Sequence, residues 1–181
     1  MGTLKTTNIQ TITGSGTLTL GTSGETLTVP TGVTVGGTLT NTPSFSAKLT
    51  SNQTFTGSTE VKVQANLENW DTDGAYDISN YRFTVPTGKA GKYLIIGSGK
   101  FSGVPANEYA RIRYYLNGSS DLFGEVRLHL AYAGDIMFKA PHIFDLSDGD
   151  YVEMYIRSDD TGTNTMLHQG TYFSGFKLIG A

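Results

Sequence analysis

The sequence predicts an all-β protein in two parts, a thin N-terminal β segment followed by a C-terminal antiparallel sandwich. Charged residues make up 16% of the 181 residues, well below the roughly 25% of an average soluble domain. The chain is rich in threonine and tyrosine, which strands favour. Short stretches that alternate polar and apolar residues recur between turn signals, and no stretch sustains a helical periodicity.

The composition changes near Pro43. No Phe, Tyr or Trp precedes it, and almost every charged residue follows it. The letters "NTPS" at 41–44 are typical of a turn. We therefore expect an attachment segment and stalk over residues 1–42 and a globular domain over residues 43–181.

The first part places Leu or Val between threonines in pieces about four residues long. One chain of such pieces holds too little apolar area to offset its ordering entropy, so it is either a flexible linker or one of several intertwined copies. The regular apolar spacing favours a three-chain β stalk, whose packed residues would include Leu18, Leu20, Leu27 and Val29.

The second part shows runs of aromatic and branched residues separated by turn signals such as "TDG", "VPANE", "NGSSD" and "LSDGD". Eight to ten strands at this spacing predict a sandwich or jelly roll. The expected strands are Phe45–Leu49, Val61–Leu67, Arg82–Val85, Gly91–Phe101, Ala110–Asn117, Glu125–Tyr132, Met137–Leu146, Tyr151–Arg157 and Thr171–Ile179.

Four motifs occur in the order seen in one known family: "PSFSAKL", "YDISNYRFTVPTGKAGKYLI", "LSDGDYVEMYI" and "TYFSGFKLIG". Over residues 43–181 the chain resembles the complement-one-q and tumour-necrosis-factor-like superfamily. The resemblance implies a ten-strand jelly roll that assembles as a homotrimer. It also implies packing or trimer-interface roles for Tyr93, Tyr151, Phe173 and Phe176.

Residues 6–43 resemble stalk segments of structural proteins from tailed bacteriophages, marine ones especially. Together the two resemblances imply a short trimeric fibre on the virion surface, made in the host cytoplasm. Its N-terminal segment would bind another virion protein, and its knob would bind a host-surface glycan or protein receptor. The alternatives are a capsid decoration or head-fibre protein and a glycan depolymerase.

Polar loops hold the candidate ligand residues. The spacing of Asp71 and Asp73 could suit calcium, although Asx turns explain it equally. Trp70 could stack on a sugar or, as we favour, close the end of the sandwich. The loop "SDDTGTNT" offers Asp159, Asp160 and Asn164 as glycan contacts or as a solvated hairpin tip.

Arg111 and Arg113 lie on one strand face with tyrosines nearby. They could bind an anionic glycan, but pairing with Glu125 or Asp121 across a hairpin is the simpler interpretation.

Several functions are disfavoured by the composition. A net charge of −3 does not suit nucleic-acid binding, which needs clustered cations. No apolar run approaches the roughly 20 residues of a membrane span, and the first residues do not read as a secretory signal. The chain has no Cys and no nucleophile or phosphate-loop motif. We therefore expect no enzyme activity, no cofactor and no metal beyond the calcium alternative.

Overall fold

The structure is a computed structural model. It describes residue 31 and residues 41–179, without the side chains of residues 120–123. The chain divides into two units, residues 1–35 and 36–181, and every described strand belongs to the second. The stalk residues Leu18, Leu20, Leu27 and Val29 lie outside the described residues, so the stalk stays a prediction. No described helix could cross a membrane.

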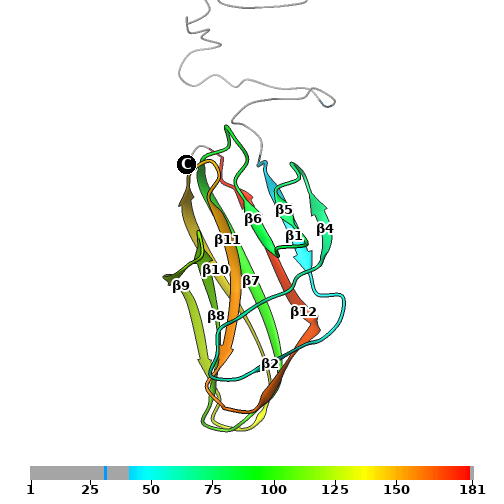
Figure 1. The fold of residues 1–181 in the computed structure, drawn as a ribbon, viewed down its shortest axis with the longest axis vertical. Coiled ribbons are helices and arrows are strands. Elements are labelled where there is room, and N and C mark those ends of the chain that lie inside the picture. Colours follow the sequence, from blue (N-terminus) through cyan, green and yellow to red (C-terminus); the bar gives the residue numbers. More distant parts are fainter. Residues whose placement is uncertain (1–30, 32–40, 180–181) are drawn as a thin grey trace, which may run out of the picture. The chain divides into compact units, whose positions relative to one another are not determined.

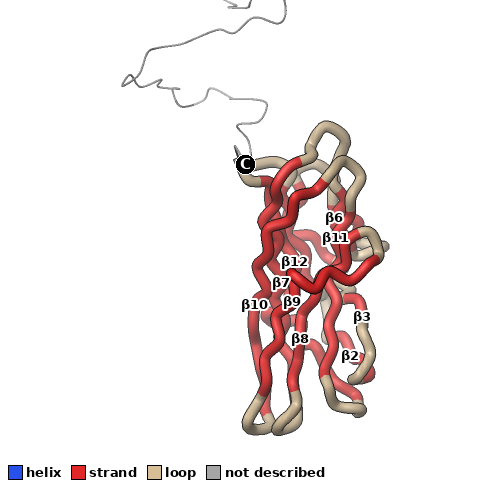
Figure 2. The backbone as a smooth tube through the Cα atoms, turned by 90° about the vertical axis from the view of Figure 1, so that its left-hand side faces the viewer, coloured by secondary structure: helices blue, strands red, loops and turns tan. Residues whose placement is uncertain are grey.

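Twelve antiparallel strands form two sheets that face each other, and no helix occurs among the described residues (Figures 1 and 2). Sheet A has the order β10-β7-β12-β1-β4, with β2 paired to β12, and sheet B has the order β5-β6-β11-β8-β9, with β3 paired to β11. The strands are β1 (Ser44–Lys48), β2 (Gln53–Thr56), β3 (Val61–Lys62), β4 (Leu67–Asp71), β5 (Tyr76–Asp77), β6 (Arg82–Thr84), β7 (Gly91–Val104), β8 (Tyr109–Leu116), β9 (Ser119–His129), β10 (Gly134–Leu146), β11 (Tyr151–Ser158) and β12 (Thr163–Lys177).

The predicted all-β sandwich is confirmed, but one predicted strand is wrong. The stretch 61–67 pairs with sheet B only at its start, and the chain then crosses to sheet A, where β4 pairs with β1. Val63 and Ala65 are buried within this crossover, which explains why the stretch alternates like a strand. The short strands β2 and β5 and the edge strand β4 were not predicted.

Aromatic side chains fill the space between the sheets. Phe45 on β1 stacks on Phe83 with ring centroids 4.7 Å apart and on Tyr76 at 5.2 Å, and Phe173 meets Phe45 edge-on at 5.1 Å. These rings come from both sheets and are all buried. Large buried rings in offset or edge-on contact contribute strongly to core stability.

Tyr114 joins the two sheets through a buried hydroxyl. It lies on β8 of sheet B, and its hydroxyl accepts a hydrogen bond from the Gly97 N–H at 2.5 Å and donates to the Ala140 carbonyl. Gly97 and Ala140 are directly paired on β7 and β10 of sheet A. Gly97 must lack a side chain here, because a Cβ would lie 2.4 Å from the Met154 sulfur.

The sandwich has two distinct ends. At the proximal end, where the described chain begins, the Lys177 N–H donates to the Pro43 carbonyl. The Asp148 carboxylate holds the 86–90 loop at this end, accepting from the N–H groups of Gly88, Lys89 and Ala90 at 2.7, 3.0 and 2.8 Å. The loops 57–60, 105–108, 130–133 and 159–162 form the distal end.

Candidate interaction surfaces

The outward side of sheet A, which we call the apolar face, exposes large hydrophobic side chains. Along β12, Phe173 and Gly175 point into the core, so Tyr172, Ser174 and Phe176 point outward. The two edge strands add to this surface, with Trp70 55% exposed on β4 and Ile143 55% exposed on β10. Lys139 and Asp145 alternate with the apolar side chains on β10, so the exposed apolar groups form patches on this face. Large exposed apolar patches on soluble proteins often mark interaction surfaces.

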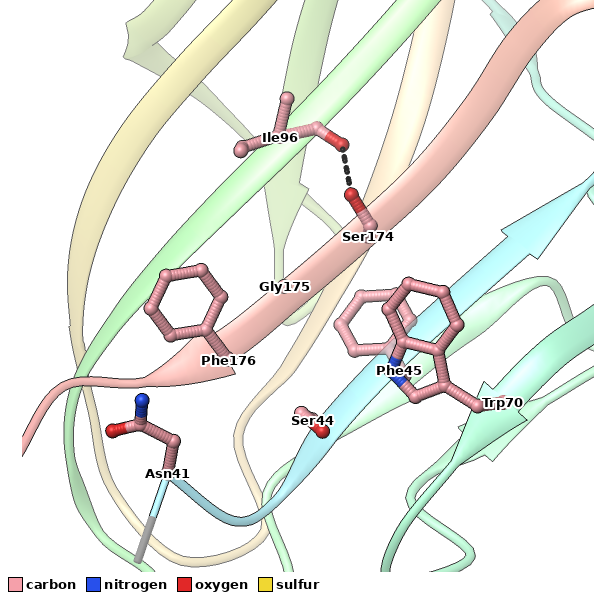
Figure 3. A pocket seen from close by; sticks show the side chains of 8 residues that line it. All are labelled: Asn41, Ser44, Phe45, Trp70, Ile96, Ser174, Gly175 and Phe176. Atoms are coloured by element: carbon pink, nitrogen blue, oxygen red, sulfur yellow. Dashed lines mark hydrogen bonds between the residues drawn. The ribbon is translucent and has the colours of Figure 1, made fainter.

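A hollow of 370 Å³ lies in the apolar face between β4 and β12 (Figure 3). Trp70 and Phe176 stand on opposite sides of it, and Gly175 lies between them. On the core side of the sheet, Gly175 leaves room for buried side chains, since a Cβ there would lie 2.5 Å from the Ile95 Cδ1 and 3.0 Å from the Phe45 ring. A second hollow of 320 Å³ shares Trp70 and Ser174 with the first and is lined by more polar groups, among them Lys48, Asn69, His168 and Tyr172.

The outward side of sheet B, which we call the charged face, has the opposite character. Arg113 donates to Glu125 from Nε at 2.8 Å, and Arg111 lies between Glu125, at 3.3 Å, and Glu60. Lys62 pairs with Glu153 at 2.5 Å. The predicted pairing of both arginines with Glu125 is therefore present, whereas sequence reasoning missed Glu60, which comes from the loop before β3.

The arginines also set the ionisation of Glu125. Partial burial by itself raises the pKa of this carboxyl, but the hydrogen bond from Arg113 and the charges of Arg111, Arg113 and Arg127 outweigh it. The pKa of Glu125 therefore lies below its ordinary range, and the carboxylate stays ionised and paired.

The four family-derived residues separate into three environments. Tyr93 and Phe173 are buried in the core, where the Tyr93 hydroxyl donates to the Lys89 carbonyl at 2.6 Å. Tyr151 lies on the charged face. The Arg82 guanidinium stacks on its ring, with 4.5 Å between the guanidinium carbon and the ring centroid. Only Phe176 of the four lies on the apolar face, beside Ile96 and Trp70. Tyr93 and Phe173 therefore have packing roles in the core, whereas the position of Phe176 suits a role at an interface.

Trp70 does not close the end of the sandwich, so the interpretation that we favoured from the sequence is wrong. It lies on the edge strand β4 opposite Ser46 of β1 and remains more than half exposed. The sequence did not predict this strand, because every residue of β4 except the last is exposed, and the strand therefore shows no alternation of polar and apolar residues.

The 159–162 loop is held by its own side chains. Asp160 accepts from the Asn164 amide at 2.7 Å and from the Gly162 N–H at 3.2 Å. Asn164 is buried, with 2% of its surface exposed, so its predicted role as a surface ligand contact is wrong. The Asp159 side chain is 42% exposed, and Thr161 and Gly162 of the same loop are exposed as well.

Asp71 and Asp73 form a turn rather than a shared cation site. Asp71 accepts from the Asp73 N–H at 3.2 Å and from the Tyr76 N–H at 2.7 Å. Asp73 instead lies 3.5 Å from Lys89. Among residue 31 and residues 41–179, no group of three or more His, Cys, Asp or Glu side chains is placed to hold a metal ion. The geometry is that of the Asx turn which the sequence offered as the alternative to calcium.

Comparison with solved structures identifies the fold. The chain is similar to the globular domain of zebrafish complement 1qA, with 16% identity over 75% of this chain and 96% of that one and a TM-score of 0.54. It is also similar to murine APRIL at pH 5.0, with 13% identity, 75% and 98% coverage and a TM-score of 0.55. A tumour necrosis factor, Eiger from S. frugiperda, matches with 8% identity, 76% and 92% coverage and a TM-score of 0.50.

No protein-family model and no curated protein matches the chain. At these low identities the likeness concerns the fold alone. That fold is the jelly roll of complement-one-q and tumour-necrosis-factor-like domains, as the four sequence motifs predicted.

Proposed function

We propose that the chain forms a short homotrimeric fibre on a virion, in which three jelly rolls meet through sheet A and display sheet B outward. The observation that carries this proposal is the division of the surface into an apolar face and a charged face. Burial of apolar area stabilises association by roughly 25 cal/mol per Å². The charged face, with its arginines and carboxylates, is suited to stay in water.

The apolar face also offers two different contact elements at its two edges. The hollow beside Trp70 and Phe176 lies toward β4, and the exposed Ile143 and Met137 lie on β10 at the opposite edge of the sheet. A contact between two different surfaces of identical chains is heterologous, and it forms a ring when the rotation closes. The family resemblance implies that this ring has three members.

The virion assignment is supported by the N-terminal resemblance to phage stalk segments. In this proposal residues 1–42 attach to another virion protein and form the stalk, and the jelly roll contacts a host-surface glycan or protein. Three parallel copies allow weak individual sites to add up through avidity.

The proposed role is non-enzymatic. The carboxylates on the charged face are held by cations, and the pKa of Glu125 is lowered, which does not suit a general acid. The pairing of these groups supports a structural and binding role for this face.

Electron microscopy with labelled antibodies tests the virion assignment. Antibodies against the purified protein should label particles from a lysate of cells that make the chain, at three-fold appendages. Label on tails supports the fibre, and label spread over heads would favour the capsid-decoration alternative. If all of the protein stays in the soluble fraction and no particle is labelled, the virion assignment is wrong.

A further inference from the structure

The distal half of the charged face contains a row of three arginines. Arg111 on β8 is directly opposite Arg157 on β11 on one side and Arg127 on β9 on the other. Like charges directly opposite each other destabilise a sheet, so this arginine row requires anions close to it.

The carboxylates of the protein neutralise the row unevenly. Glu125 forms ion pairs with Arg111, Arg113 and Arg127. Glu60 forms ion pairs with Arg111 and Arg113. Among the described residues, Arg157 has Asp159 as its ionic partner, at the long distance of 3.9 Å. Counting only the side chains that the structure describes, four guanidinium groups thus share three carboxylates, and the deficit is greatest at Arg157.

The two ends of the row can be reached from solvent, since the side chains of Arg127 and Arg157 are 48% and 30% exposed. Arg127 is stacked on the Tyr109 ring, with 4.1 Å between the guanidinium carbon and the ring centroid. This stacking fixes the guanidinium plane. One nitrogen of the group donates to Glu125 at 3.1 Å, and its solvent-exposed part remains open to a carboxylate or sulfate. Tyr132 is 85% exposed in the distal 130–133 loop, which follows β9, the strand that carries Arg127, and it offers a flat apolar ring at this end of the molecule.

We propose that the distal half of the charged face binds an acidic polysaccharide. Carboxylate or sulfate groups of the glycan pair with Arg127 and Arg157, and a neighbouring sugar ring packs on Tyr132. The inference deepens the proposed host-glycan contact and rests on that function. A nucleic acid fits less well, because the arginine row is short and the whole chain carries a net charge of −3.

Biolayer interferometry on the full chain tests the proposal with four immobilised polymers: a polyuronate, dextran sulfate, neutral dextran and duplex DNA. The wild-type protein should bind one or both acidic polymers, more weakly as salt rises, and should ignore neutral dextran. Preference for the polyuronate or for dextran sulfate identifies the anionic group.

The double variant Arg127→Gln/Arg157→Gln should lose at least about ten-fold in affinity, as expected when a solvent-exposed pair of charge contacts is removed. Arg82→Gln is the matched control, because Arg82 lies on the same face in its proximal half, above Tyr151. Tyr132→Ala is a second variant that should also weaken binding, and its exposure makes a folding defect unexpected.

The proposal is overturned if neutral dextran binds equally, if duplex DNA binds more tightly than the acidic glycans, or if Arg82→Gln loses as much as the double variant. Light scattering on the same samples distinguishes a failure of the glycan inference from a failure of the proposed trimer. A trimer that binds no acidic glycan overturns this inference alone. A monomer that binds through Arg127 and Arg157 overturns the trimer and leaves the glycan site standing.

Discussion

At the residue scale, the Tyr114 hydroxyl is the most specific contact between the two sheets. It is buried and forms hydrogen bonds with two backbone groups of sheet A, the Gly97 N–H and the Ala140 carbonyl. Removing the hydroxyl leaves a buried donor and a buried acceptor with one partner fewer, which costs about 1–3 kcal/mol. We expect Tyr114→Phe to lower the free energy of unfolding by about that amount while keeping the fold.

Urea unfolding at a fixed protein concentration measures this effect, because an oligomer's stability depends on concentration. Tyr132→Phe is the matched control, since it removes the same hydroxyl from a ring that is 85% exposed and should change nothing. Equal stability of Tyr114→Phe and wild type would show that the hydroxyl does not contribute to holding the sheets together.

At the element scale, Asp148 couples the β10–β11 turn to the 86–90 loop. The Gly88 N–H is the main cause that lowers the pKa of Asp148, with further contributions from the N–H groups of Ala90 and Lys89 that outweigh its slight desolvation. Because the folded-state pKa is depressed, the stabilisation is present above the unfolded value of about 3.9 and is lost as pH falls through the folded-state pKa.

We therefore expect Asp148→Asn to be less stable than wild type near neutral pH, with the difference vanishing in acid. Thermal unfolding over a pH series measures this convergence. Asp159→Asn is a control that removes an exposed carboxylate from the distal loop, and its difference from wild type should not follow this pH profile. A difference between Asp148→Asn and wild type that persists unchanged into acid would contradict the account.

The elements also show what the sequence could and could not predict. Strands with one buried face, such as β10 and β11, alternate visibly and were predicted to within a few residues. Strand β4 was missed because an edge strand with polar, exposed residues carries no such pattern. The alternation of Val63 and Ala65 was misread as a strand, because a crossover between sheets buries side chains in the same way.

The candidate surfaces depend on pairings between distant parts of the chain. Trp70 and Phe176 were each noticed in the sequence, but the hollow between them exists because β1 joins β4 to β12. Glu60 completes the arginine cluster from a loop that sequence spacing does not connect to β8. Local patterns predict elements and faces, whereas these juxtapositions follow from the strand order.

At the scale of the whole molecule, the two sheets present opposite surfaces, and the central claim is that the apolar face is covered by copies of the same chain. A charge placed in the hollow should weaken this contact. We expect Phe176→Asp to dissociate at a higher protein concentration than wild type, whereas Thr84→Asp, on the charged face, should not.

The native mass of the full-length protein, measured by light scattering over a dilution series, tests the claim most directly. The account predicts a mass near three times 19.4 kDa for wild type, and dissociation of Phe176→Asp before Thr84→Asp as the protein is diluted. A wild-type mass of 19.4 kDa at every concentration would contradict it, because the apolar face would then stay in water without a partner.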